Sequence, residues 1–296
     1  MKDSFSSCHP AVNFLYFTLV LLFSMFFLHP YCLFISLLCS FGYAFYLKRN
    51  RALQFQLKFM LPLLLITALI NPAFNHRGVT ILFYLHNGNP ITLESILYGL
   101  AASTMLISVL CWFSCYNEVM TSDKFIYLFG RIIPALSLIF SMVLRFVPKF
   151  KAQIRVVSNA QKCVGRDVSN GKLLERIRHG IRILSIMVTW ALENAIETAD
   201  SMRSRGYGLK GRTAFSIFRL DSRDKFMLAA IALTGGYVLF GAGMGAVSFR
   251  YFPSIKWTGM GGFEASVIAA YLLLSLLPVI LNIWEDRKWK LLQSNI

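Results

Sequence analysis

Residues 14–51 read FLYFTLVLLFSMFFLHPYCLFISLLCSFGYAFYLKRNR, and their apolar character is the first indication of the fold. It contains two apolar runs, residues 14–28 and 31–47, which are separated only by His29-Pro30. The second run ends at the basic sequence Lys48-Arg49-Asn50-Arg51. An apolar run followed by positive charge is typical of a membrane-spanning helix that ends at the cytoplasmic surface. The stretch therefore predicts a tight helical hairpin of two membrane spans.

The composition of the whole chain also indicates a membrane protein. Of its 296 residues, 56% are apolar and only 15% are charged, whereas soluble domains carry about 25% charged residues. The formal charge of +16 would suit nucleic-acid binding, but the positive-inside bias of membrane proteins explains it better. The cysteines and histidines are scattered without metal-ligand spacing. We therefore expect no metal site, no cofactor and no nucleic-acid partner.

Four further apolar runs have the composition of membrane spans, and they cover residues 59–74, 96–113, 226–247 and 265–284. Between the first two of these, residues 75–92 combine turn-forming dipeptides such as Asn87-Gly88 with a β-prone stretch. This combination predicts a small extracellular hairpin. The expected fold is an all-α integral membrane protein with about six transmembrane helices and a cytoplasmic domain that contains two long helices.

The basic residues orient these spans. With the N-terminus inside, all but three of the 30 Lys and Arg residues lie on the cytoplasmic side. The exceptions are Arg77, Arg250 and Lys256. We therefore expect a multi-pass protein of the cell membrane with both termini in the cytoplasm.

Residues 125–147 are apolar as well, but a span there would place the basic residues that follow it outside. Arg131, Pro134 and Arg145 interrupt the apolar run, which suits a membrane-edge or re-entrant hairpin instead. The chain then divides into an N-terminal membrane domain of four spans (residues 1–123), a cytoplasmic domain (124–225) and a C-terminal hairpin of two spans (226–296).

The cytoplasmic domain is predicted to contain two helices that each end at a glycine. The first covers about 148–164 and ends at Gly165, and the second covers about 181–205 and ends at Gly206. In the second helix six residues recur at intervals of three and four and predict an apolar face: Ile183, Ile186, Met187, Trp190, Ala191 and Ala195. Arginine near a helix C-terminus complements the helix dipole. Two such ends in one basic segment also predict two exposed tips that offer guanidinium groups to a partner.

At these tips the sequence resembles the transmembrane T component of energy-coupling factor transporters, a CbiQ-like family of vitamin and metal-ion importers. The family carries Ala-Arg-Gly motifs at the ends of two cytoplasmic coupling helices. Ser204-Arg205-Gly206 is similar to the second motif, and Cys163-Val164-Gly165 occupies the place of the first. Residues 71–100 and the stretch LRFVPKF (144–150) also resemble the family.

The resemblance implies a non-catalytic scaffold that joins two ABC-type ATPase subunits to a small substrate-binding membrane subunit, the S component. It assigns ATPase coupling to a set of tip residues: Lys162, Gly165, Arg166, Ser204, Arg205 and Gly206. ATP would be bound and hydrolysed by the partners, since the sequence contains no G-x-x-x-x-G-K-[ST] phosphate loop. No catalytic residues are assigned.

Gly241 and Gly245 lie four residues apart in the fifth expected span, so they predict one helical face that a neighbouring helix approaches closely. The neighbour is either another helix of this chain or a helix of a partner membrane protein.

Two other classes of function stay open. A stand-alone channel or permease is the first alternative. The second is a membrane enzyme that acts on lipid and uses the basic segment to bind anionic headgroups. The central parts of the six expected spans carry no charged residue, which argues against ion-coupled transport.

Overall fold

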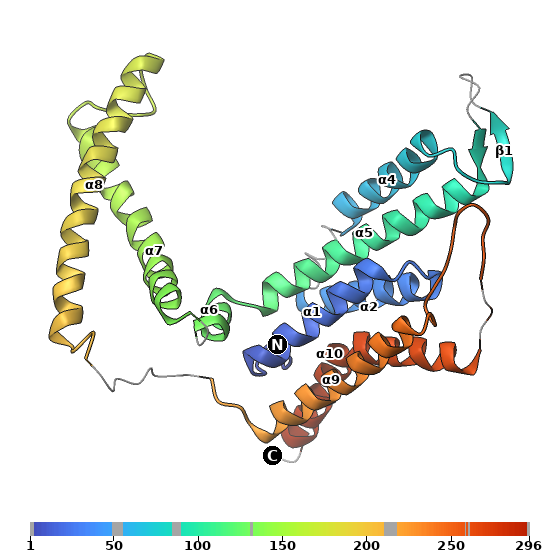
Figure 1. Ribbon diagram of the computed structural model, residues 1–296. Helices are drawn as coiled ribbons and strands as arrows, with labels where there is room; N and C mark the ends of the chain where they lie inside the picture. The colour runs from blue at the N-terminus through green and yellow to red at the C-terminus, as the bar shows by residue number, and fades with distance from the viewer. Residues whose placement is uncertain are drawn as a thin grey trace. The chain divides into compact units, whose positions relative to one another are not determined.

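The computed structural model describes residues 3–48, 56–84, 90–130, 133–209, 218–257, 259 and 261–294 (Figure 1). Most of these residues are helical, and the part of the chain described contains one two-stranded sheet. The elements in chain order are α1 (Pro10–Phe26), α2 (Pro30–Lys48), the π-helix η1 (Gln56–Met60), α4 (Leu61–Phe74), β1 (Ile81–Tyr84), β2 (Pro90–Thr92), α5 (Leu93–Val119), α6 (Ser122–Gly130), α7 (Pro134–Cys163), α8 (Leu173–Ser204), α9 (Ser222–Gly243) and α10 (Gly262–Ser294). The predicted all-α fold is confirmed.

The chain folds as two compact units. The first combines Met1–Phe125 with Phe218–Ile296, and the second is Ile126–Ile217. We call the first the membrane unit and the second the α7–α8 unit. The predicted division at residues 123/124 and 225/226 concerns which residues lie in the cytoplasm, and it stays a prediction.

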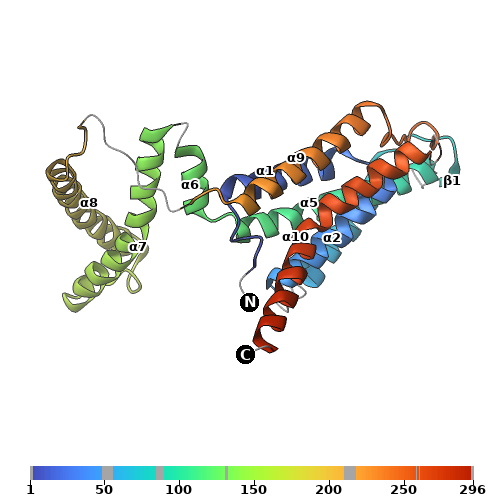
Figure 2. The same ribbon diagram turned by 90° about the horizontal axis from the view of Figure 1, so that it is seen from below.

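Six apolar helices of the membrane unit (α1, α2, α4, α5, α9 and α10) lie where the six spans are predicted. Four of them, α2, α5, α9 and α10, are long and apolar enough to cross a membrane, whereas Pro10–Phe26 and Lys58–Phe74 are shorter apolar helices. Helix α5 packs against α1, α2 and α4, and α10 packs against α2 and α9. Figure 2 shows α10 alongside α2. The turn between α1 and α2 is short, but each packs mainly on other helices. The prediction of a tight hairpin is therefore wrong about their pairing.

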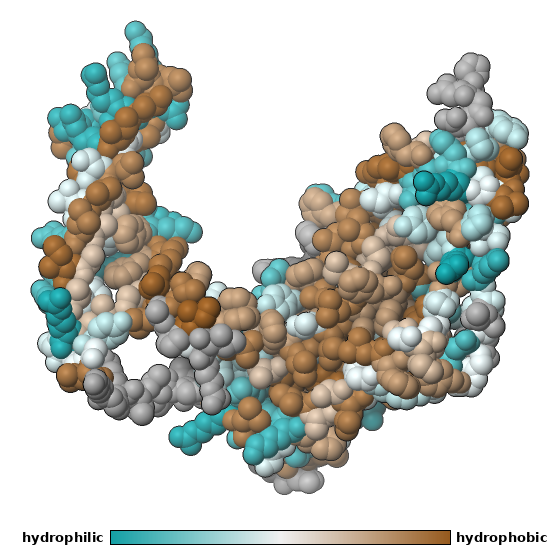
Figure 3. Space-filling view, in the orientation of Figure 1, coloured by the Kyte–Doolittle hydropathy of each residue, from teal (hydrophilic) through white to brown (hydrophobic). Residues whose placement is uncertain are grey.

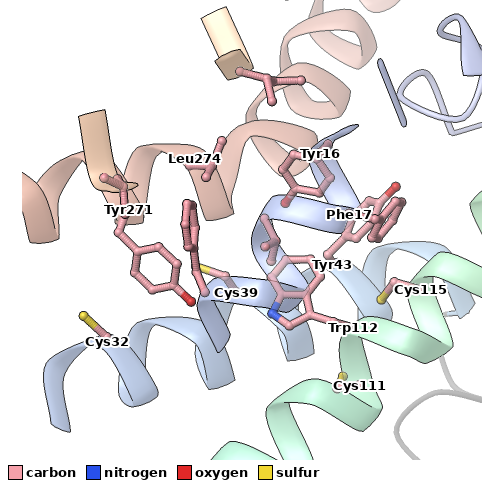
Figure 4. Packing of buried hydrophobic residues seen from close by; sticks show 14 of the residues in the cluster. Tyr16, Phe17, Cys32, Cys39, Tyr43, Cys111, Trp112, Cys115, Tyr271 and Leu274 are labelled. Carbon is pink, nitrogen blue, oxygen red and sulfur yellow. The ribbon is translucent and has the colours of Figure 1, made fainter. Parts of the chain in front are cut away.

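Aromatic side chains fill the centre of the membrane unit (Figure 4). Tyr16, Tyr43 and Trp112 are fully buried there. Trp112 Nε1 donates to Ser36 Oγ at 3.1 Å, and the Tyr16 hydroxyl donates to the Ser275 carbonyl oxygen at 3.2 Å. An unsatisfied buried polar group costs about 1–3 kcal/mol. These hydrogen bonds therefore allow large amphipathic side chains to pack in the core.

The outward surface of the membrane unit is apolar over large areas, which are brown in Figure 3. On α4, Leu69 is 71% exposed and Phe74 is 83% exposed. Soluble monomers rarely expose extended apolar patches. Such a surface is typical of helices that face lipid or a partner protein in the membrane.

The hairpin predicted between the third and fourth spans is present. β1 pairs with β2 in antiparallel orientation, and β2 lies against α4 and α5. Residues 85–89, which include the predicted turn Asn87-Gly88, lie outside the described residues. The extracellular placement of this hairpin stays a prediction.

Residues 125–147 form most of α6 and the first half of α7. A break near Pro134 is confirmed, since α7 begins there, and a proline in the first turn loses no helical hydrogen bond. Arg145 lies inside α7, so the helix continues through this charged residue, whereas Arg131 lies outside the described residues. The predicted helix start near residue 148 is wrong, because Pro148 lies in the interior of α7. The membrane-edge placement of this segment stays a prediction.

Helix α8 also begins earlier than predicted, at Leu173 instead of near residue 181. The Glu175 carboxylate accepts a hydrogen bond from the backbone N–H of Lys172 at 3.3 Å. This contact satisfies a backbone donor at the helix start, as the glutamate of a capping box does. The predicted end at Gly206 is correct, since Arg205 is the C-cap.

Candidate functional site

The first candidate tip is the end of α7 with the loop that follows, residues 161–170. Gly165 has a φ of +74°, which glycine adopts without strain. Its N–H donates to the Lys162 carbonyl oxygen, and the N–H of Arg166 donates to the Gln161 carbonyl oxygen, both at 2.9 Å. These two hydrogen bonds form a Schellman motif in which Val164 is the C-cap residue.

Charged side chains near the first tip pair with one another. Lys162 Nζ lies 3.6 Å from Asp167 Oδ1, and the hydroxyl and amide of Ser169 donate to the same carboxylate at 2.6 and 2.9 Å. The Ser169 hydrogen bonds, with a smaller contribution from Lys162, lower the pKa of the Asp167 carboxyl. Arg166 is half-buried, whereas Val164 is 65% exposed. The exposed cap position of this tip therefore carries no charge.

The second candidate tip is the end of α8, residues 202–209. Gly206 has a φ of +77°. Its N–H donates to the Arg203 carbonyl oxygen at 2.9 Å, and the N–H of Tyr207 donates to the Met202 carbonyl oxygen at 3.0 Å. The C-cap residue is Arg205.

Around this second cap, Ser204 and Arg205 are both exposed. The Ser204 hydroxyl donates to the Ser201 carbonyl oxygen at 2.9 Å, so it serves its own helix. The Arg205 side chain forms no hydrogen bond or ion pair with the residues that the structure describes. Its guanidinium is therefore available to a partner.

The two tips share one backbone motif but differ at its cap. Val164 and Arg205 occupy the same C-cap position, and Gly165 and Gly206 both follow it with a left-handed φ. The structure thus supports the alignment of Cys163-Val164-Gly165 with Ser204-Arg205-Gly206. The coupling role of these residues stays a prediction.

A small apolar cluster packs α7 against α8, which cross in Figure 1. Its buried members are Val157, Ile183 and Met187, and Trp190 is half-buried beside them. The Trp190 ring lies edge-to-face with that of Phe150, with the centroids 5.2 Å apart. The apolar face predicted for the second helix is confirmed at Ile183, Met187 and Trp190. Its partners on α7 were not identified from the sequence.

The packing places the tips at opposite ends of α8, because the first tip comes before the helix and the second ends it. Helix α8 has 32 residues, and a rise of 1.5 Å per residue gives it a length of about 48 Å. Two separate partner subunits, or two distant sites on one partner, are therefore required to bind both tips at once.

A second apolar row on α8 faces away from the cluster. Its six members recur at intervals of three and four, and each is more than half exposed: Ile177, Ile181, Leu184, Val188, Leu192 and Ile196. We call this row the α8 stripe. The spacing of this row can be recognised in the sequence, but only the apolar face that contains Trp190 was predicted from it. An unpartnered stripe at helical spacing is typical of a helix that docks on another surface.

The two glycines of the fifth span have different surroundings. A Cβ at Gly241 would collide with the Val267 side chain of α10, so this glycine permits close packing inside the membrane unit. Gly245 lies beyond the end of α9 with a φ of +82°. The predicted shared helical face is wrong for Gly245, because the helix ends at Gly243 in a left-handed turn. Of the two neighbours left open, α10 of the same chain lies at Gly241.

Comparisons with known proteins agree with these features. The family model CbiQ, described as a cobalt transport protein, matches residues 2–217. The chain is 30% identical over 194 residues to the energy-coupling factor transporter transmembrane protein EcfT of Streptococcus thermophilus, a match that covers 62% of this chain and 73% of that protein. It is 29% identical over 192 residues to EcfT of Staphylococcus aureus, which covers 60% and 71%, respectively. A match to EcfT of Lactococcus lactis is 35% identical over 99 residues but spans only 33% of this chain and 37% of the relative.

Proposed function

Because the chain belongs to the CbiQ family of cobalt transport proteins and is an energy-coupling factor T component, we propose that it couples two cytoplasmic ATPases to a substrate-binding membrane subunit. ATP binding and hydrolysis would take place on the partners. The substrate would be a vitamin or a metal ion, recognised by the membrane partner.

The main support for this proposal is the matching backbone motif at the ends of α7 and α8. Each tip presents an exposed cap residue next to a glycine, and the two tips are separated by the length of α8. Arg205 is the strongest contact residue, since its charged group is exposed and arginine forms bidentate hydrogen bonds with carboxylates. At the first tip Lys162 and Arg166 supply the charge beside the neutral cap. Two ATPase subunits would then bind at two separate points.

The α8 stripe supports contact with the substrate-binding subunit. It offers apolar side chains along most of one helix, and a membrane protein partner has an apolar surface to match it. When the ATPases close and reopen, the tips would move with them. Rigid-body motion of α7 and α8 would carry that movement to the stripe.

The proposal implies an orientation in the membrane. The tips must be in the cytoplasm to reach ATPases, so the protein would lie in the cell membrane with both termini inside. The excess of basic residues on that side is consistent with this orientation.

The decisive experiment is a charge reversal at the second tip. Affinity-tagged protein is purified from detergent-solubilised membranes of its own cells, and co-purifying ABC-type ATPases are measured by mass spectrometry. We expect Arg205→Glu to lose the ATPase that contacts this tip and to abolish uptake. A buried charge-assisted contact of this kind is worth about 1.5–3 kcal/mol, and reversal adds repulsion.

Arg203→Glu is the matched control, because Arg203 is exposed in the last turn of the same helix but does not occupy the cap. It should retain the ATPases. If the unaltered protein brings down no ATPase, or if Arg205→Glu leaves uptake intact, the proposal is wrong.

A further inference from the structure

The outer strand of the β-hairpin is apolar on both of its faces. The four residues of β1 are consecutive and exposed: Ile81 is 45%, Leu82 51%, Phe83 56% and Tyr84 64% exposed. Successive side chains of a strand point to opposite faces. Each face of β1 therefore presents two large apolar side chains, and Figure 3 shows apolar brown at the end of the unit that carries this strand.

Water is a poor environment for such a strand. A two-stranded hairpin is marginally stable in water, and β1 has no second strand partner among the residues that the structure describes. A docked protein would cover one face of the strand and leave the other in water. An apolar medium that surrounds the strand satisfies both faces, and a lipid bilayer is such a medium.

The hairpin is joined to surfaces that already face the membrane. It connects α4 with α5, and Phe74 at the end of α4 is 83% exposed. The polar groups at the base of the hairpin are satisfied internally. Glu94 is buried, and its Oε1 accepts hydrogen bonds from the amide and hydroxyl of Thr80 at 3.2 and 2.9 Å. The Thr92 hydroxyl donates to the Arg77 carbonyl oxygen at 3.1 Å.

Two observations set the depth at which the hairpin lies. The free edge of β1 carries backbone groups that hydrocarbon does not satisfy, so the strand does not enter the bilayer centre. Phe83 and Tyr84 are aromatic, and aromatic side chains such as tyrosine are favoured at the membrane–water boundary. The Arg77 side chain is exposed and has no acidic partner among the described residues, which suits a lipid phosphate.

We propose that this β-hairpin is an interfacial anchor, which places the side chains of β1 at the boundary between lipid headgroups and acyl chains. The anchor would hold the outer ends of α4 and α5 at a defined depth in the bilayer. It depends only on the membrane location of the chain and not on the coupling function.

The test uses the full chain in proteoliposomes with a fluorescent label on either face of β1. Cys163 is the only exposed cysteine among those described, so Cys163→Ser serves as the background and as the blank for labelling. Leu82→Cys and Phe83→Cys place one label on each face, and both positions are exposed, so the hairpin packing is kept. Ser201→Cys on α8 is the water-exposed control.

We expect a nitroxide carried at the shallow acyl position of the lipid to quench the labels at residues 82 and 83, while aqueous iodide quenches neither. The label at residue 201 should respond to iodide alone. Iodide quenching at both β1 positions would overturn the proposal. Lipid quenching of one face with protection of the other from both quenchers would also overturn it, in favour of a protein partner.

Discussion

Val164 and Arg205 occupy the same cap position in two matching helix ends, yet only one of them carries a charge. The first tip is therefore expected to bind its partner more weakly than the second. Its charged residues are also less available, because Lys162 is paired with Asp167 and Arg166 is half-buried. The difference between the two tips therefore arises from single side chains, because the backbone motif is the same at both.

Restoring an arginine at the first cap should strengthen that contact. Val164 is 65% exposed, so Val164→Arg places its guanidinium in solvent without disturbing the packing. A new charge-assisted contact of about 1.5–3 kcal/mol corresponds to roughly a tenfold or larger gain in affinity. The measurement is the amount of ATPase retained on the purified protein as the salt concentration rises. Val156→Arg, at another exposed position on α7, should give no gain. Equal retention by both variants would contradict the prediction.

For single residues, the sequence predicted the backbone conformation better than it predicted the side-chain contacts. The positions of Gly165 and Gly206 after their helices follow from the freedom of glycine to adopt a left-handed φ. The pairing of Lys162 with Asp167 depends on how the loop folds back over the helix end, and no local pattern encodes that.

Among the elements, α9 and α10 approach each other closely at Gly241, where a Cβ would collide with Val267. Gly241→Ala should therefore destabilise the membrane unit by about 1–3 kcal/mol, the usual cost of overpacking. Gly236 lies in the same helix, and a Cβ there meets no described atom within 4 Å. Gly236→Ala should be neutral or slightly stabilising, since alanine favours the helix more than glycine does. Thermal unfolding in detergent measures both, and equal midpoints would show that the contact is not tight.

The errors in helix boundaries have a common origin. Pro148 reads as a helix start, because proline is tolerated in the first turn of a helix, but it lies in the interior of α7, and Pro134 provides the real start. Gly245 reads as part of a helical face, although the chain has already turned out of α9. Local patterns identify residues that can end a helix, whereas packing decides which of them do.

For the whole molecule, hydropathy was sufficient to locate six apolar helices, because a bilayer requires long apolar segments whatever their packing. It was not sufficient to identify the contacts that hold the chain's N-terminal segment. Asp3 accepts hydrogen bonds from the Tyr43 hydroxyl at 2.8 Å and from Asn282 Nδ2 at 2.5 Å. These residues are far apart in sequence, so their pairing follows only from the folded bundle.

Lys124 completes this arrangement near the point where the chain leaves the membrane unit at Phe125. Its side chain is only 7% exposed. Its ammonium group donates to the carbonyl oxygens of Ser6 and Val119, the latter at 2.9 Å. Burial lowers the pKa of Lys124, with an opposing contribution from Asp3. The lysine thus joins the N-terminal segment to the end of α5.

Lys124→Met should loosen both attachments, because two carbonyl oxygens lose their donor and each unsatisfied buried group costs about 1–3 kcal/mol. We expect faster backbone hydrogen exchange in residues 3–8 and 119–125, with unchanged exchange in α8. Lys225→Met is the matched control, since Lys225 is an exposed lysine close to the point where the chain re-enters the membrane unit at Phe218. If the two variants exchange alike, Lys124 does not hold the junction, and other contacts, such as those of Asp3 with Tyr43 and Asn282, hold the N-terminal segment.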